Sequence, residues 1–128
     1  MITVDNLSKS YGEVEAVKSI DFELNDGEVV GFLGANGAGK STTLKVITGY
    51  LSPTSGTVYV NGMNILENNH EIQTQIGYLP ELNPLYAEMR VYDLLNFTAQ
   101  IRDISGKAFK NALSRVIDQC GLKGIIHR

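Results

Sequence analysis

The sequence predicts an α/β fold with a β-rich N-terminal part, a phosphate-binding loop that leads into a helix, and a helical C-terminal part. Three observations predict this order. Residues 1–33 carry short alternating apolar runs, residues 34–41 match the pattern G-x-x-x-x-G-K-S, and apolar residues recur at helical spacing from Val91 onward. A period of two is typical of half-buried strands, whereas spacings of three and four residues are typical of amphipathic helices. We therefore expect antiparallel β-structure ahead of the loop and helices well after it.

The first part of the chain predicts strands. Ile2, Thr3 and Val4 alternate apolar and polar side chains, and Leu7 continues toward the turn signal at Tyr11 and Gly12; residues 14–24 alternate in part. The Asn-Asp-Gly turn at residues 25–27 most simply closes a hairpin between the second strand and residues 29–33. Because residues 29–33 form a short, nearly continuous apolar run, we expect them to be a buried strand.

The glycine-rich loop predicts a bound phosphate. Its glycines allow a tight turn that brings backbone N–H groups close to phosphate oxygens. Lys40 supplies a positive charge for the β and γ phosphates, Ser41 offers a hydroxyl to Mg²⁺, and the following helix directs its positive end at the same anion. An ordinary strand-to-helix turn would not need Lys followed by Ser. The residues expected to bind are Gly34, Ala35, Asn36, Gly37, Ala38, Gly39, Lys40, Ser41 and Thr42.

The remaining elements follow from local signals. We expect a helix after the loop with Leu44, Ile47 and Thr48 on one face and Gly49 at its end. Residues 57–60 predict a strand, residues 61–62 (Asn-Gly) a turn, residues 71–75 a short helix, and residues 76–79 another short strand. Prolines at positions 80 and 84 exclude regular structure there.

Two helices are predicted in the last third. The first has apolar positions at Val91, Leu94, Leu95, Thr98 and Ile101. In the second, Ser105 is the expected cap and Gly121 the expected end, and its apolar face comprises Phe109, Ala112, Leu113, Val116, Ile117 and Cys120. Without a linker-like composition, this part is expected to be a subdomain rather than an independent domain.

Bulk properties restrict the class of protein. The chain has 128 residues, a net charge of −3 and one cysteine, Cys120, so an internal disulfide is impossible. The negative charge argues against nonspecific nucleic-acid binding, and we expect no nucleic-acid partner. No apolar stretch approaches the ~20 residues that span a bilayer, and the N-terminus lacks the pattern of a signal peptide.

Four segments together resemble the N-terminal half of an ATP-binding cassette (ABC) transporter ATP-binding subunit. These are residues 8–12 (Ser-Lys-Ser-Tyr-Gly), the loop at 34–42, residues 52–58 together with 61–62, and residues 76–81 (Ile-Gly-Tyr-Leu-Pro-Glu). The resemblance covers essentially the whole chain and is closest to bacterial drug-efflux or gliding-motility subunits. It implies a P-loop NTPase fold of ABC type with an incomplete sheet. Residues 1–128 would then be a partial ATP-binding domain, divided into a β-subdomain at 1–33, the P-loop and Q-loop region at 34–87, and the start of a helical subdomain at 88–128.

The resemblance also implies residue roles, with ATP and Mg²⁺ as cofactors. Tyr11 would stack on adenine, although it could instead be a turn aromatic packed on its strand. Lys40 would be the catalytic lysine, and Ser41 and Glu81 would bind the metal. Glu81 stands where the family usually has Gln; a carboxylate is still an acceptable Mg²⁺ ligand, and an exposed loop acid is the alternative.

Partners are implied in the same way. Residues Glu81 to Tyr86, which include Asn83 and Pro84, would dock onto a transmembrane permease subunit, or could tuck into the helical part. A second ATP-binding subunit would complete a nucleotide sandwich. The location would be cytoplasmic, peripheral on the inner face of the cell membrane.

Several parts of an ABC ATPase are not found in this sequence. It has no Leu-Ser-Gly-Gly-Gln-like signature, no apolar run before an Asp-Glu pair, and no switch histidine, and it ends at Arg128. Because phosphoryl transfer needs a metal and a water-orienting residue, we expect weak nucleotide binding and no turnover by this chain alone. The runs at 29–33 and 76–79 would lack neighbouring strands, so exposed edges and a partial or assembling protein are expected.

Two other functions remain open from the residues. One is a stand-alone nucleotide-binding or regulatory module without hydrolysis. The other is a different P-loop enzyme such as a kinase or GTPase. The 33 residues before the loop argue against a kinase, and the absence of an Asn-Lys-x-Asp guanine reader argues against a GTPase.

Overall fold

The computed structural model describes residues 1–82 and 85–128. The chain divides into two compact units, Met1–Tyr78 and Leu79–Arg128, and each is described by itself. Among the described residues, no helix combines the length and the apolar character needed to cross a membrane.

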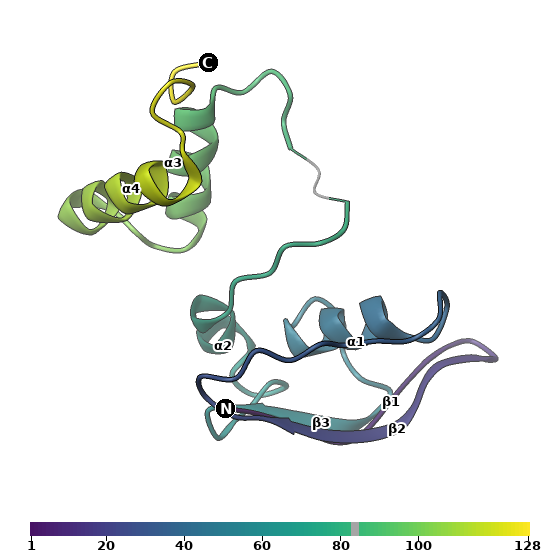
Figure 1. Ribbon diagram of the computed structural model, residues 1–128. Coiled ribbons are helices and arrows are strands. Elements are labelled where there is room, and N and C mark those ends of the chain that lie inside the picture. The colour runs from purple at the N-terminus through teal and green to yellow at the C-terminus, as the bar shows by residue number, and fades with distance from the viewer. Residues whose placement is uncertain (83–84) are drawn as a thin grey trace. The chain divides into compact units, whose positions relative to one another are not determined.

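A four-stranded antiparallel sheet forms the base of the first unit (Figure 1). It comprises β1 (Ile2–Tyr11), β2 (Val14–Leu24), β3 (Ser55–Val60) and β4 (Met63–Asn64), in the order β2-β1-β3-β4. Val4 is central, because it pairs with Phe22 of β2 on one side and Val58 of β3 on the other. The predicted strands at 2–11 and 14–24 and the N-terminal antiparallel β part are confirmed.

The predicted strand at 29–33 is wrong, and so is the hairpin expected at the Asn-Asp-Gly turn. β2 pairs with β1 instead, and residues 28–35 run on without strand pairing. Val29 is 102% exposed and Leu33 is 93% exposed. The predicted strand at 76–79 is likewise not formed. A short apolar run becomes a buried strand only when neighbouring strands flank it, and no described strand flanks either run.

The Asn-Gly turn was predicted correctly, and the structure adds the strand that follows it. Asn61 and Gly62 have φ values of 50° and 80° and join β3 to β4. Two consecutive positive φ angles are the geometry that the Asn-Gly pair favours in a two-residue hairpin. The strand predicted at 57–60 begins two residues earlier, at Ser55.

Two helices cover one side of this sheet in Figure 1: α1 (Lys40–Ile47) and α2 (Asn69–Gln75). The core between these layers consists of Val4, Leu7, Val17, Val46, Ile47, Val58, Val60, Ile65 and Ile72. The predicted face of α1 is partly wrong. Leu44 is exposed, whereas Thr43 is buried because its hydroxyl donates a 2.8 Å hydrogen bond to the carbonyl of Gly39.

The second unit contains α3 (Val91–Ile101) and α4 (Gly106–Cys120), both close to the predicted bounds. Ser105 is the N-cap residue, although its side chain makes no capping hydrogen bond, and Gly121 ends α4 with φ 65°. Tyr92 and Phe109 join the two helices through an edge-to-face contact with centroids 6.2 Å apart. Cys120, expected on the apolar face, is exposed.

Candidate nucleotide-binding site

The glycine-rich loop is a closed turn held by its own backbone. Gly37 and Gly39 have φ values of 84° and 92°, which side chains other than glycine rarely adopt. The N–H of Ala38 donates to the carbonyl of Ala35 at 3.1 Å. A tight glycine-rich turn of this kind is the backbone that binds phosphate oxygens.

Gly39 also fits tightly against β2. Lys9 pairs with Val17 and Ser10 pairs with Glu15, so Ala16 is an extra residue that bulges from β2. A Cβ built on Gly39 would lie only 2.3 Å from the carbonyl oxygen of Ala16. The sheet and the loop therefore contact each other at a point where only glycine fits.

The N-terminus of α1 faces the loop with unpaired donors. The first helical bond runs from the N–H of Thr43 to the carbonyl of Gly39 at 2.9 Å. The N–H groups of Lys40, Ser41 and Thr42 precede it and have no backbone acceptor among residues 1–82 and 85–128. Unpaired N–H groups at a helix start, together with the helix dipole, favour an anion.

Lys40 closes the loop from the inside. Its Nζ atom donates to the carbonyl of Ala35 at 2.8 Å and also to the carbonyl of Gly34. An ammonium group with three donors held by two carbonyls still has one donor for a phosphate oxygen. The loop residues and Lys40 are thus brought together as the sequence predicts, and their contact with nucleotide remains a prediction.

The residues predicted to hold Mg²⁺ lie in different units. Ser41 is exposed in the first unit, and its hydroxyl makes no hydrogen bond to another described residue. One free hydroxyl suits Mg²⁺, which is bound by few protein oxygens, several waters and substrate phosphates. Glu81 is exposed in the second unit. In the described part of the chain, no group of three or more His, Cys, Asp or Glu residues forms a metal cluster.

Tyr11 lies at the end of β1 that approaches the loop. It pairs with Val14, two residues from the bulged Ala16 that contacts Gly39. The ring is 49% exposed, and the Nζ atom of Lys9 lies 5.4 Å from its centroid. A half-exposed tyrosine offers aromatic surface for stacking, so the adenine contact remains a prediction that this position permits.

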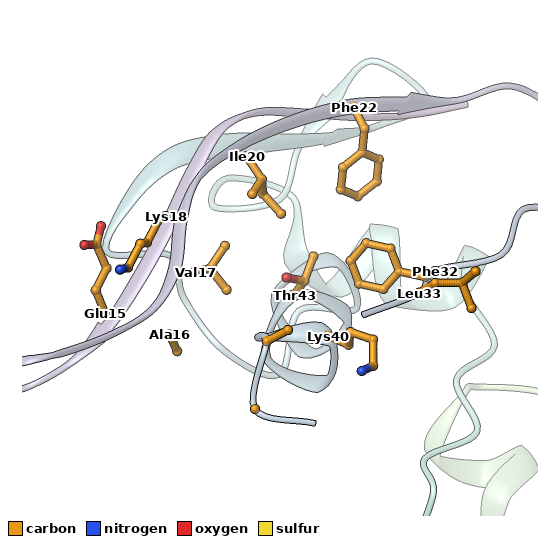
Figure 2. Close-up of a pocket in the computed structure, with 12 residues that line it drawn as sticks. Glu15, Ala16, Val17, Lys18, Ile20, Phe22, Phe32, Leu33, Lys40 and Thr43 are labelled. Carbon is orange, nitrogen blue, oxygen red and sulfur yellow. The ribbon is translucent and has the colours of Figure 1, made fainter. Parts of the chain in front are cut away.

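A pocket of about 550 Å³, not anticipated from the sequence, adjoins Lys40. Figure 2 shows Val17, Ile20 and Phe22 of β2 projecting toward Thr43 and Phe32. Phe22 and Phe32 lie 5.9 Å apart at 46°. The partial alternation of β2 indicated that one of its faces is apolar. The sequence does not reveal that this face packs against the segment containing Phe32. Gly37, Ala38 and Lys40 of the glycine-rich loop also line the pocket, so it combines an apolar wall with donors that can bind phosphate.

The predicted permease-docking stretch is exposed where it is described. Leu82, Leu85 and Tyr86 are 86%, 60% and 62% exposed, and Tyr86 contacts Phe97 edge-to-face at 6.1 Å. Asn83 and Pro84, which belong to the same prediction, lie outside the described residues.

Comparisons with known proteins agree with this geometry. A family model described as "ABC transporter" matches residues 17–128. The chain is 36% identical over 128 residues to "Uncharacterized ABC transporter ATP-binding protein YxlF" of Bacillus subtilis (strain 168), covering 100% of this chain and 42% of that protein. It is 36% identical over 125 residues to "Probable multidrug ABC transporter ATP-binding protein YbhF" of Escherichia coli (strain K12), covering 98% and 22%.

A solved structure gives the same result in three dimensions. The structure titled "Structure of ATP binding subunit of ABC transporter" superposes with a TM-score of 0.86 at 28% identity, covering 99% of this chain and 53% of that one. The chain thus spans less than half of each of the two curated relatives and about half of this solved chain.

Proposed function

The chain belongs to the ABC transporter family of ATP-binding proteins, and we propose that its loop at residues 34–42 binds the phosphates of Mg-ATP. The observation that carries the proposal is the set of donors converging on the loop. Lys40 is held at the loop by two of its carbonyls, and the first N–H groups of α1 have no backbone acceptor in the described part of the chain. Such convergent donors bind an anion more strongly than either feature would alone.

Different residues would bind the phosphates, the metal ion and the base. The backbone of Gly37, Ala38 and Gly39 surrounds the phosphates, and Lys40 neutralises charge on the β and γ groups. Ser41 and Glu81 would each offer an oxygen to Mg²⁺, which would offset the charge of the phosphates when bound. Tyr11 provides a stacking face for the base, and stacking on an aromatic contributes roughly 1–3 kcal/mol.

Hydrolysis, transport and assembly are proposed for the whole protein to which this chain corresponds. In it, ATP binding and hydrolysis would drive transport through a permease subunit docked at residues 81–86. A second ATP-binding subunit would complete each nucleotide site, at the inner face of the cell membrane. The name of the E. coli relative, "Probable multidrug ABC transporter ATP-binding protein YbhF", supports drugs as the transported compounds.

For the 128-residue chain alone, we propose weak binding without turnover. The sequence contains neither a signature motif nor an apolar run before an Asp-Glu pair, whose glutamate would orient the attacking water. Steady phosphate release well above that of the Lys40→Ala variant would contradict this part of the proposal. It would also mean that another acid of the chain replaces the missing base.

Binding is tested by a thermal shift, because a ligand that binds only the folded state raises its midpoint. Mg-ATP at a hundred times its dissociation constant should stabilise the chain by about 2.7 kcal/mol. Mg-GTP should act similarly, since stacking on Tyr11 does not read the edges of the base. Mg²⁺ without nucleotide is the control, and an unchanged midpoint with both nucleotides would overturn the proposal.

A further inference from the structure

We propose that Lys9 is a positioning residue for the base of the bound nucleotide, acting through Tyr11. The inference rests on the proposed function, because it concerns the same nucleotide. Its physical basis is the placement of the Lys9 ammonium group, which contacts both the Tyr11 ring and a backbone carbonyl of a different segment.

The ammonium group of Lys9 is fixed at two points. Its Nζ atom lies 5.4 Å from the centroid of the Tyr11 ring and donates a 2.8 Å hydrogen bond to the carbonyl of Ser52. A lysine side chain is normally mobile, so a hydrogen bond across 43 residues of sequence indicates a defined position. The ring is therefore presented with a cation on one face, within the distance at which cation–π attraction operates.

Residues 52–54, which accept the hydrogen bond from Lys9, also make hydrogen bonds to the end of β1 that contains Tyr11. The N–H of Ser10 donates to Oγ1 of Thr54 at 2.9 Å, and the N–H of Thr54 donates to the carbonyl of Ser8 at 2.9 Å. Together with the bond from Lys9 to Ser52, these bonds tie the end of β1 to residues 52–54. The three residues at positions 8–10, just before Tyr11, are thus each hydrogen-bonded to residues 52–54.

This arrangement determines which face of Tyr11 can receive a base. Lys9 and Tyr11 are two residues apart on β1, and the ammonium group covers one side of the ring. Tyr11 as a whole is 49% exposed. A base therefore stacks on the side opposite Lys9, on a ring whose orientation is set before binding. Preorganisation of this kind increases affinity because less side-chain freedom is lost on binding.

The inference predicts a loss confined to the base. Lys9→Met keeps the length and apolar stem of the side chain but removes the charge and the donor. We expect it to weaken Mg-ATP binding about two- to fivefold, the range given by a solvent-exposed cation–π contact. Binding of Mg-tripolyphosphate, which has no base, should be unchanged. Lys9→Arg, which keeps both a cation and donors, should restore affinity for Mg-ATP.

A double-mutant cycle separates positioning from general destabilisation. In a Tyr11→Ala background, Lys9→Met should have no further effect on Mg-ATP, because the ring through which it acts is gone. Lys110→Met, at an exposed position of α4, is the charge-matched control and should leave both affinities unchanged. Calorimetry of all variants with both ligands gives the complete cycle.

The outcomes are distinct. An ATP-selective loss in Lys9→Met that disappears in the Tyr11→Ala background supports the inference. Equal losses for ATP and tripolyphosphate, a loss that persists without Tyr11, or no loss at all would each overturn it. If the unaltered chain binds neither ligand, the proposed function itself fails and the inference fails with it.

Discussion

The carbonyl oxygen of Ala16 lies so close to the α-carbon of Gly39 that an added Cβ would approach it to 2.3 Å. This contact joins the bulge of β2 to the phosphate-binding loop, and so connects the antiparallel sheet to the start of α1. The bulge and the base-stacking candidate Tyr11 lie at the same end of the β1–β2 hairpin. In the proposed site, this hairpin therefore sets where the base would lie relative to the phosphates. In the proposed site, the N-terminal β-structure therefore contributes residues and is not only a support.

Gly39→Ala should damage both folding and binding. The new methyl group would meet the Ala16 carbonyl, and φ at this residue is 92°. We expect a loss of about 1–3 kcal/mol in the free energy of unfolding, the cost of forced backbone strain, measured by urea denaturation.

Gly37→Ala is the matched control for this contact. Gly37 has a similar φ of 84° but no atom within 4 Å of an added Cβ. It should therefore show only the left-handed backbone cost of about 1–2 kcal/mol. If both variants lose the same stability, the contact with Ala16 has no energetic role.

Leu7→Ala should be the more damaging of two leucine truncations. Leu7 is 0% exposed at the centre of the sheet's packed face, whereas Leu66 is 57% exposed. Removing a buried leucine side chain costs about 2–5 kcal/mol, because the lost transfer energy adds to a cavity term. Leu66→Ala should stay within about 0.5 kcal/mol of the unaltered chain. Similar losses from both, in thermal or urea unfolding, would contradict the assignment of the core.

Val29→Lys should reduce self-association with little effect on stability. Val29 is 102% exposed in an apolar run whose backbone has no strand partner among the described residues. Such runs favour pairing between chains, and a lysine opposes it. Sedimentation at increasing concentration should show association of the unaltered chain, reduced in the variant. Leu66→Lys, which adds the same charge elsewhere, should not reduce it. A monodisperse monomer at all concentrations would contradict this prediction.

The pKa of Glu28 should lie below its ordinary value of 4.5. The cause is hydrogen bonding from the backbone N–H of Asn25 at 2.9 Å and from its side-chain Nδ2 at 3.2 Å, both of which stabilise the carboxylate. A lowered pKa means that these bonds add stability above pH 4.5 and that this contribution is lost as the pH falls through the lowered value.

An NMR titration of the Glu28 carboxyl carbon measures this shift. Asn25→Ala removes the Nδ2 donor but keeps the backbone donor, so the pKa should rise only part of the way toward its ordinary value. Glu28→Gln should abolish the contribution of this group to the pH dependence of stability. A pKa unchanged by Asn25→Ala would show that the side-chain bond does not form in solution.

The sequence predicted well where local signals are sufficient. The strand character of the segments that form β1 and β2 follows from their partial alternation, and the Asn61–Gly62 turn and the end of α4 at Gly121 follow from residues that tolerate positive φ. The loop was predictable because its chemistry is confined to consecutive residues. The buried face of α1 was not predictable, since the burial of Thr43 depends on a hydrogen bond from its hydroxyl to the carbonyl of Gly39.

Nonlocal features account for the other differences. Residues 29–33 have the composition of a buried strand, but strand formation depends on neighbours elsewhere in the chain. The Ala16 bulge and its contact with Gly39 depend on a pairing register that alternation alone does not determine. The pocket beside Lys40 likewise depends on which segment faces Phe22.

Calorimetric titration of Mg-ATP into the unaltered chain and its Lys40→Ala variant tests the central claim most directly. Lys45→Ala, an exposed position on the same helix, is the matched control. Because hydrogen bonds to charged groups contribute about 1.5–3 kcal/mol, we expect Lys40→Ala to bind roughly 10- to 100-fold more weakly. Lys45→Ala should bind as the unaltered chain does. No binding by the unaltered chain, or equal affinity in all three proteins, would contradict the claim that this loop binds the nucleotide.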